Sequence, residues 1–325
     1  MADASGDVMY DVPANAVIPT CDANSLCTFA WGNYKFVVNA AYGARVIEYS
    51  LSGNNVLLTQ AQAEGTAGDS SSYEDNFGGT FWPSPQNGTG GWGWPPIVAI
   101  DTGAFTVSIE SNVLHLTSAS FTIASGDPTM TAEKRFSVDS STGVVTVQYT
   151  FNNTGTTSVS VAPWEISRVP AGALTFFPNP SATAITSDCN GGMAVPTTTT
   201  VDSYTFFVNV GSPQGKFCGN GGPKSYEAVI SKGLLLVQAW PNVAGASFAP
   251  GEGNSEFYTD PSSVYEEVEN QGPYVPIAGG GSSNWTVRWT LTSAASLTVP
   301  TANPTATSTT LQAIEAAADA QALLQ

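Results

Sequence analysis

The sequence predicts an all-β fold with one short helix at its C-terminal end. Short runs rich in β-branched and aromatic residues, in which apolar and polar positions alternate, recur along most of the 325-residue chain. Clusters of Gly, Asn, Ser and Pro, which favour tight turns, lie between these runs. No convincing helical pattern interrupts them, and the short connections favour antiparallel hairpins. These three observations predict a large antiparallel sandwich or barrel.

The predicted strands follow one another closely along the chain. In order they are Tyr34–Asn39, Arg45–Leu51, Ala104–Glu110, Val113–Ser118, Lys134–Val138, Val144–Asn152, Ser158–Val161, Tyr204–Val208, Leu234–Trp240, Glu256–Tyr258, Ser263–Glu269 and Trp285–Thr292. Turns rich in Ser, Gly or Asn, such as Ser52–Asn55 and Ser140–Gly143, separate them. The spacing has no fixed period, which argues against a propeller.

Composition divides the chain into three parts. Residues 1–29 form an N-terminal extension with two closely spaced cysteines, and residues 30–298 form one β domain without an internal break. Residues 299–325 begin with a Thr-, Ala- and Pro-rich stretch that is typical of a linker or strap. Leu311–Gln325 consists of strong helix formers with a weak apolar stripe. We expect this helix to pack on the domain; the alternative is self-association or docking on a partner.

The charge of the chain excludes several classes of function. Nine basic residues against 26 acidic ones give a net charge of −17. Nucleic-acid binding and docking on anionic lipid both need a cationic surface, so neither is expected. No run of about 18 apolar residues occurs, so no membrane-spanning helix is predicted. Neutral ligands such as sugars remain compatible with this surface.

The four cysteines predict disulfides and an oxidising compartment. We predict the pairs Cys21–Cys27 and Cys189–Cys218, and the two other pairings remain open. A four-thiolate zinc site is the competing interpretation, but no CxxC pair occurs. The first residues carry neither the basic nor the apolar region of a signal peptide. We therefore expect an extracellular or periplasmic protein whose signal peptide has been removed, with a cytosolic chain as the alternative.

A loop rich in tryptophan and proline is the densest unusual segment. It runs from Asn76 to Pro96 and contains Trp82, Gln86, Trp92 and Trp94. Pro fixes the backbone, Gly lets it approach closely, and Trp offers a flat apolar face with one N–H donor. These properties suit a sugar ring with its C–H face and hydroxyl rim. The alternative is that these side chains only cap the core.

Two charged residues follow in Ala162–Val169. Glu165 and Arg168 lie in an aromatic, apolar context within a chain that has only 11% charged residues. A buried carboxylate needs a partner, and Arg168 is the nearest candidate for Glu165 in the sequence. The pair is either a structural ion pair or the polar lining of a pocket.

A third segment, Tyr265–Tyr274, carries adjacent acidic residues. In a strand, Tyr265, Glu267 and Glu269 share one face, while Glu266 points to the other. Carboxylates two residues apart lie about 7 Å apart and suit acid–base work or cation binding. Crowding raises the pKa of one of them. A solvated acidic edge strand is the alternative.

Other catalytic motifs are absent from the sequence. His115 is the only histidine; it alternates with Leu114 and Leu116, so it faces away from them and has a structural role. One histidine excludes a multi-histidine metal site, and neither a GxSxG elbow nor a phosphate-binding glycine loop occurs. We predict neither a metal nor a cofactor.

Several segments together resemble the galactose-mutarotase-like (aldose 1-epimerase-like) superfamily. They span roughly residues 30–292 and are Tyr42–Gly53, Gly78–Gly79, Trp82–Gln86, Trp94–Pro96, Pro163–Ile166 and Tyr265–Pro273. The resemblance implies a β-supersandwich of two large antiparallel sheets whose concave face binds carbohydrate. It also implies a late-strand glutamate as base, to which Glu269 or Glu267 corresponds by its position near the end of the domain. The family's histidines have no match, so ordinary aldose 1-epimerase activity is not expected.

Three functional hypotheses follow. The first is a secreted protein that binds a carbohydrate ligand through the residues Trp82, Gln86, Trp92, Trp94, Glu165, Arg168, Glu267, Glu269 and Tyr274. The second is an epimerase, lyase or hydrolase that uses the same site, with Glu269 or Glu267 as base and Glu165 or Tyr274 as proton donor. The third is a structural or self-assembling surface protein. The sequence leaves open whether the protein is an enzyme.

Overall fold

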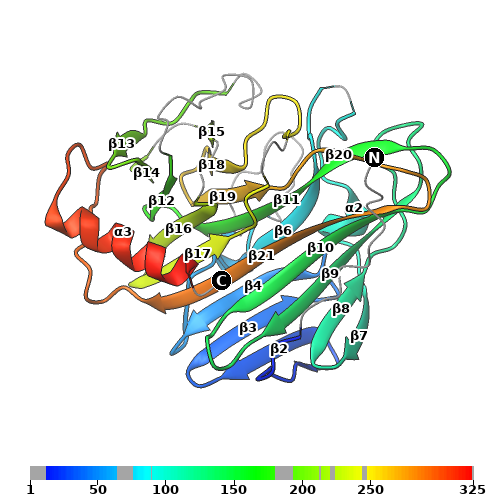
Figure 1. The fold of residues 1–325 in the computed structure, drawn as a ribbon, viewed down its shortest axis with the longest axis horizontal. Coiled ribbons are helices and arrows are strands. Elements are labelled where there is room, and N and C mark those ends of the chain that lie inside the picture. The colour runs from blue at the N-terminus through cyan, green and yellow to red at the C-terminus, as the bar shows by residue number, and fades with distance from the viewer. Residues whose placement is uncertain are drawn as a thin grey trace.

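Two large antiparallel sheets pack face to face in this protein (Figure 1). The structure, a computed structural model, describes residues 12–63, 76–88, 90–179, 193–211, 214–219, 224–243 and 247–323. Each sheet has an inner face, which packs on the other sheet, and an outer face. The arrangement confirms the antiparallel sandwich that the alternating runs predict.

The first sheet, here called sheet I, has eleven strands. Across the sheet they are β1 (Thr20–Cys21), β2 (Leu26–Trp31), β3 (Tyr34–Asn39), β4 (Arg45–Leu51), β6 (Gly79–Ser84), β11 (Val159–Pro170), β19 (Tyr265–Gln271), β18 (Ser255–Thr259) and β15 (Gly215–Gly219), with β5 (Asn54–Asn55) beside β4 and β20 (Val275–Ile277) beside β11. Segments that are far apart in the sequence, such as β6 and β19, therefore flank the same strand, β11.

The second sheet, sheet II, has ten strands. Across the sheet they are β13 (Thr199–Val201), β14 (Tyr204–Val208), β12 (Leu174–Pro178), β16 (Tyr226–Ser231), β17 (Leu234–Ala239), β21 (Ser282–Ser293), β10 (Val145–Asn153), β9 (Met130–Val138), β8 (Val113–Thr117) and β7 (Thr106–Glu110). The long strands β21, β10 and β9 cross the middle of Figure 1 beside one another.

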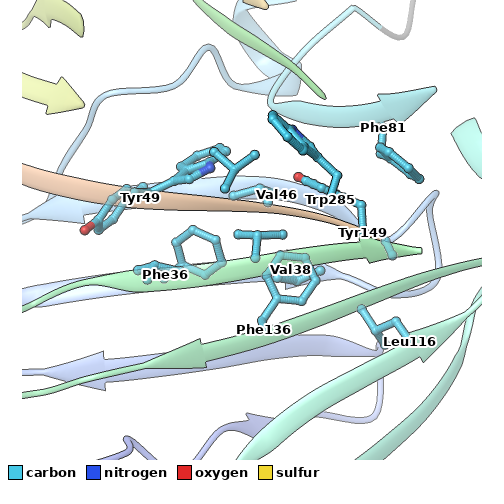
Figure 2. Packing of buried hydrophobic residues seen from close by; sticks show 14 of the residues in the cluster. Phe36, Val38, Val46, Tyr49, Phe81, Leu116, Phe136, Tyr149 and Trp285 are labelled. Carbon is cyan, nitrogen blue, oxygen red and sulfur yellow. The ribbon is translucent and has the colours of Figure 1, made fainter. Parts of the chain in front are cut away.

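Aromatic side chains fill the space between the two sheets (Figure 2). Phe36 and Tyr49 of sheet I contact Trp289 of sheet II, with ring centroids 5.9 and 6.3 Å apart. Phe81 stacks on Tyr149 at 4.3 Å. Burial of each such ring contributes about 1.5–3 kcal/mol. The period-two alternation of the sequence places these rings on the inner faces.

Every strand predicted from the sequence is present. Tyr34–Asn39, Arg45–Leu51 and Tyr204–Val208 have the predicted bounds. The pattern misses β6, β12, β15 and β16, in which every residue is buried. A strand covered on both faces need not show apolar–polar alternation, which weakens the signal. It also misses β2, β20, the short strands β1, β5 and β13, and the second half of β11.

The C-terminal helix packs on the outer face of sheet II. The prediction at Leu311–Gln325 corresponds to α3 (Thr309–Ala322), which begins after Ser308, whose hydroxyl accepts the Leu311 N–H at 3.1 Å. The apolar side of α3, Leu311, Ile314 and Ala318, lies against residues such as Leu235 and Val237 of β17. Within the described ranges the other helices, α1 (Gln60–Ala63) and α2 (Val98–Asp101), are single turns. Among the described helices, none is long and apolar enough to cross a membrane.

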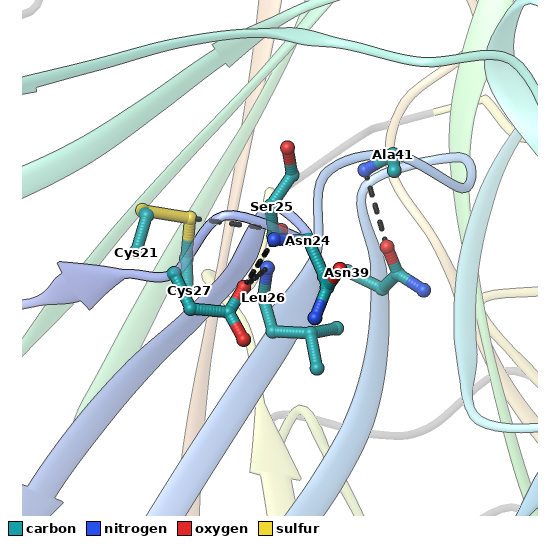
Figure 3. Close-up of a disulfide and its surroundings, with 8 residues drawn as sticks. Cys21, Asn24, Ser25, Leu26, Cys27, Asn39 and Ala41 are labelled. Carbon is teal, nitrogen blue, oxygen red and sulfur yellow. Dashed lines mark hydrogen bonds between the residues drawn. A yellow bond between two sulfur atoms is a disulfide. The ribbon is translucent and has the colours of Figure 1, made fainter.

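The predicted disulfide Cys21–Cys27 is present and joins β1 to β2 (Figure 3). The two residues are register partners, and the side chain of Asp22 shapes the turn by accepting the N–H groups of Asn24 and Leu26 at 2.9 Å. Cys218 is also disulfide-bonded. Its predicted partner, Cys189, lies outside the described residues.

Candidate functional site

The site is a pocket on the outer face of sheet I, over β6, β11, β19, β18 and β15, with a volume of about 530 Å³. We call it the tryptophan pocket. Its lining residues are Asn76, Trp82, Gln86, Asn87, Trp94, Trp164, Met193, Gln214, Lys216, Tyr258, Asp260, Pro261, Tyr265, Glu267 and Glu269. Of the residues predicted as a site, Trp82, Gln86, Trp94, Glu267 and Glu269 meet here.

The register of sheet I explains why these side chains converge. Directly paired residues of neighbouring strands point to the same face. Glu267 pairs with Tyr258, which pairs with Lys216. Two residues further along β19, Glu269 pairs with Glu256. These five side chains therefore share the outer face of the sheet. Four of them, Lys216, Tyr258, Glu267 and Glu269, form the polar half of the pocket, and Glu256 lies beside them.

The apolar half of the pocket is a group of tryptophans. Trp164 of β11 and Trp82 of β6 are register partners with ring centroids 5.5 Å apart, and Trp94 contacts Trp82 at 6.4 Å. The Trp82 indole donates to Asp101 at 2.7 Å, which fixes the ring. Trp92 does not line the pocket; it donates to the Pro83 carbonyl at 2.7 Å and packs against Trp82. The predicted loop around Trp82 is thus a buried strand.

Glu267 is held by a buried arginine. Arg168 Nε lies 2.7 Å from Glu267 Oε1, and Arg168 also donates to the Thr80 hydroxyl at 3.1 Å. The Arg168 guanidinium lies 5.3 Å from the centroid of the Trp82 ring. Arg168 is fully buried and does not line the pocket. Burial raises the pKa of Glu267 to about 7, although Arg168 acts to lower it.

Glu269 lies between an indole and an ammonium group. Its Oε2 atom accepts from Trp164 Nε1 at 2.8 Å and from Lys216 Nζ at 3.1 Å. The same Lys216 Nζ lies 2.7 Å from Glu256 Oε2. Burial raises the pKa of Glu269 and of Glu256 to about 7, and Lys216 acts to lower both. Both pKa values lie nearer to neutral pH than that of an exposed glutamate.

Glu165 lies away from the pocket, between the sheets. It accepts hydrogen bonds from Asn270 Nδ2 at 3.1 Å and from Trp289 Nε1 at 3.0 Å, and Gln238 donates to it as well. The expected pairing of Glu165 with Arg168 is wrong, because residues three apart in a strand point to opposite faces. Tyr274 lies between β19 and β20 and is not a lining residue.

Sequence reasoning did not include Lys216, Tyr258 or Trp164 among the site residues. Lys216 lies in Gly215–Gly219, a strand that the alternation does not reveal. The one available signal is that a chain with nine basic residues places a lysine within an otherwise uncharged segment. A buried lysine needs a carboxylate partner, so such a position points to a polar cluster.

Two further groups of titratable residues are His115 with Glu133, and Cys218 with Glu252 and Glu256. His115 faces away from its buried leucine neighbours, as predicted, and Nε2 lies 2.8 Å from Glu133 Oε2 on β9. Within the described part of the chain, one group has metal-ligand spacing: Cys218, Glu252 and Glu256. Because Cys218 is disulfide-bonded, it supplies no thiolate to a metal ion.

Comparison with known proteins places the fold. No protein-family model and no curated protein matches the sequence. A solved galactose mutarotase-like protein from Clostridium acetobutylicum has a TM-score of 0.55 and 12% identity over 86% of this chain and 99% of its own. A galactose mutarotase-like protein from Lactobacillus casei has a TM-score of 0.54 and 10% identity, over 82% and 100%. A galactose mutarotase related enzyme from Lactobacillus acidophilus has a TM-score of 0.53 and 7% identity, over 83% and 98%. These similarities, together with the two packed sheets, show that the chain has the galactose mutarotase-like fold.

Proposed function

We propose that the protein binds a carbohydrate in the tryptophan pocket. The observation that carries this proposal is the division of one pocket into an indole half, with Trp82, Trp94 and Trp164, and a polar half, with Glu267 and Glu269. The apolar C–H face of a sugar ring packs on indoles, and its hydroxyls bond to carboxylates and amides. The fold, which the solved mutarotase-like proteins share, supports a sugar-related role.

The test uses a half-buried tryptophan at the pocket. We expect Trp94→Ala to weaken sugar binding by about tenfold, the equivalent of about 1.4 kcal/mol, because it removes one stacking surface. The matched control is Trp31→Ala, since Trp31 is also half-buried but lies in β2, away from the pocket. Binding is measured by calorimetry against a panel of neutral, acidic and amino sugars. Equal affinities of both variants for every bound sugar would contradict the proposal.

A second candidate function is catalysis on the bound sugar. The observation that favours it is that Glu267 and Glu269 line the pocket with a pKa of about 7, whereas exposed glutamates ionise well below neutrality. Glu269 would serve as base, and Glu267 with Arg168 would orient a hydroxyl. Among the pocket residues, Tyr258 is the proton donor nearest in register to Glu267.

Optical rotation tests the epimerase branch of this candidate. Freshly dissolved α-glucose or α-galactose should reach its equilibrium rotation faster with the protein than in buffer, and Glu269→Gln should remove the acceleration. Release of reducing ends or of unsaturated sugars from oligosaccharides tests the hydrolase and lyase branches. If all three assays show no turnover of a sugar that binds, the protein is a binding protein.

We also propose that the protein acts outside the cytosol. The Cys21–Cys27 disulfide supports this, since such bonds persist in oxidising compartments. Thiol labelling of the protein recovered from its native source tests the proposal. Free thiols at these two positions would contradict it.

A further inference from the structure

We infer that Glu256 and Glu269 form a carboxyl dyad that shares one proton, with Glu269 facing the ligand and Glu256 acting through it. The inference rests on the proposed function, because it assigns the proton chemistry of the tryptophan pocket. It supplies a proton donor beside Glu269 although the pocket lining contains no histidine. Glu256 is therefore a positioning residue for the pocket.

The register of β18 and β19 places the two carboxyls side by side. Glu256 and Glu269 are direct cross-strand partners on the outer face of sheet I, and both are fully buried. Lys216 Nζ lies 2.7 Å from Glu256 Oε2 and 3.1 Å from Glu269 Oε2, so both carboxylates lie against one ammonium group. Like charges in directly opposite positions destabilise a sheet unless one of them is neutralised.

Two oxygens of the dyad, Glu269 Oε1 and Glu256 Oε2, have no hydrogen-bond partner, and Glu256 Oε2 is ion-paired with Lys216. Glu256 Oε1 accepts from the Gly253 N–H and from Gln271 Nε2, each at 3.0 Å, which fixes that carboxyl. Glu269 Oε2 accepts from Trp164 and Lys216. Glu269 Oε1 is buried without a hydrogen-bond partner, and Glu269 is a lining residue of the pocket. This unpartnered oxygen is where a sugar hydroxyl can meet the dyad.

The surrounding charges favour retention of the shared proton. Glu252 lies 3.9 Å from Lys216, and the carboxyl of Glu227 accepts the Glu256 N–H at 3.1 Å. On the other side, Glu267 is paired with Arg168, and Tyr258 lies between Lys216 and Glu267 in the register. One ammonium group therefore faces several carboxyls in a largely buried site, where two adjacent ionised carboxylates are costly. The raised pKa values of Glu256 and Glu269 agree with this balance.

The shared proton gives the pocket both halves of acid–base chemistry. With one proton, the dyad carries one negative charge, which Lys216 balances. When Glu269 accepts a proton from a ligand hydroxyl, the O–H bond breaks, a carboxyl O–H bond forms, and the dyad becomes neutral with two protons. Return of either proton to a ligand oxygen restores the starting state. No oxidant, reductant or metal is required.

The first experiment is an NMR titration of the unmodified protein, labelled with ¹³C at the glutamate side-chain carboxyls and assigned through the backbone. A shared proton makes the resonances of Glu256 and Glu269 titrate in two steps with the same two midpoints. Two independent single-step curves would overturn the inference. The measurement contains no sugar, so its outcome is separate from that of the binding test with Trp94→Ala.

Two variants should move the Glu269 midpoint in opposite directions. Glu256→Gln removes the neighbouring negative charge and leaves Lys216, so the pKa of Glu269 should fall by about one unit or more, a tenfold change in proton affinity. Lys216→Met removes the cation, so the pKa of Glu269 should rise. The matched control is Glu266→Gln, because Glu266 is equally buried on β19 but bonds to Thr175 on the other face. The dyad is contradicted if the pKa of Glu269 moves in the same direction in Glu256→Gln and Lys216→Met. It is also contradicted if Glu266→Gln moves that pKa as far as Glu256→Gln does.

Discussion

Arg168 shows how one side chain orders the pocket without lining it. Its guanidinium is fully buried behind Trp82 and contacts Glu267 and Thr80. A buried cation needs a carboxylate partner. Removing the cation leaves that carboxylate as an unpaired buried charge, which destabilises the folded protein. The orientation of Glu267 in the pocket therefore depends on a residue that a ligand does not touch.

We expect Arg168→Met to lower the free energy of unfolding by about 3–5 kcal/mol, because it leaves the buried Glu267 carboxylate without its counter-charge. The double variant with Glu267→Leu should recover part of this loss, since it removes the orphaned charge. Urea unfolding of the two variants measures the difference. As a control, Arg288→Met at a half-buried position should change stability by less than about 0.5 kcal/mol. Equal effects at both arginines would contradict the prediction.

The sequence predicts the relative orientation of side chains that lie in the same strand. The common face of Glu267 and Glu269 follows from period two alone, and the structure confirms it. Lys216 reaches the same pocket through the pairing of β15 with β18, and the sequence does not reveal which strands become neighbours or in what register. For the same reason the sequence suggests Glu165 as the partner of Arg168. In the structure Arg168 pairs with Glu267 from the neighbouring strand β19.

At the scale of elements, the sequence pattern predicts strands rich in β-branched and aromatic residues better than strands that contain glycine or proline. β3 and β4 were predicted with their observed bounds, whereas β6, with Pro83 and Gly79 in its sequence, resembles a loop. Gly78, just before β6, has a φ of +63°, and a Cβ atom there would lie 2.3 Å from the Val46 carbonyl oxygen on β4. This glycine, which makes the segment look like a turn, lets the chain approach β4 where β6 begins.

The helix α3 gives a prediction at the same scale. Ile314 is fully buried between α3 and sheet II, so Ile314→Ala should destabilise the protein by about 2–5 kcal/mol. Gln312→Ala, on the exposed side of α3, should have an effect below about 0.5 kcal/mol. Chemical unfolding followed by tryptophan fluorescence compares the two. A negligible effect of Ile314→Ala would mean that α3 does not dock on sheet II, and would favour a helix that is available to a partner.

At the scale of the whole molecule, buried carboxyls with raised pKa values shape the response to pH. Burial raises the pKa of Glu165, Glu256, Glu267 and Glu269 to about 7, and that of Glu266 to about 8. A carboxyl of this kind binds more protons in the folded than in the unfolded state between its unfolded pKa and its folded pKa. Its contribution to stability is thus fully present below about pH 4.5 and is lost as the pH rises to about 8.

We therefore expect the melting temperature to fall as the pH rises from about 5 to 8, a range in which many proteins are most stable. Glu266→Gln should make the free energy of unfolding fall less steeply with pH, by up to about 1.4 kcal/mol per pH unit. The neutral amide keeps the Thr175 contact without a charge to bury. Calorimetric scans of the two proteins across this range measure the slopes. A melting temperature that rises toward pH 8 in the native protein would contradict the prediction.

The edges of the two sheets have a consequence for how the chain behaves at high concentration. Sheet I begins with β1, a strand of two residues that the Cys21–Cys27 disulfide ties to β2, and sheet II begins with β13, a strand of three. Another chain can extend a sheet only by pairing with a row of free N–H and C=O groups. Strands this short offer few such groups, so these two edges resist amyloid-like growth while the long strands stay in the interior.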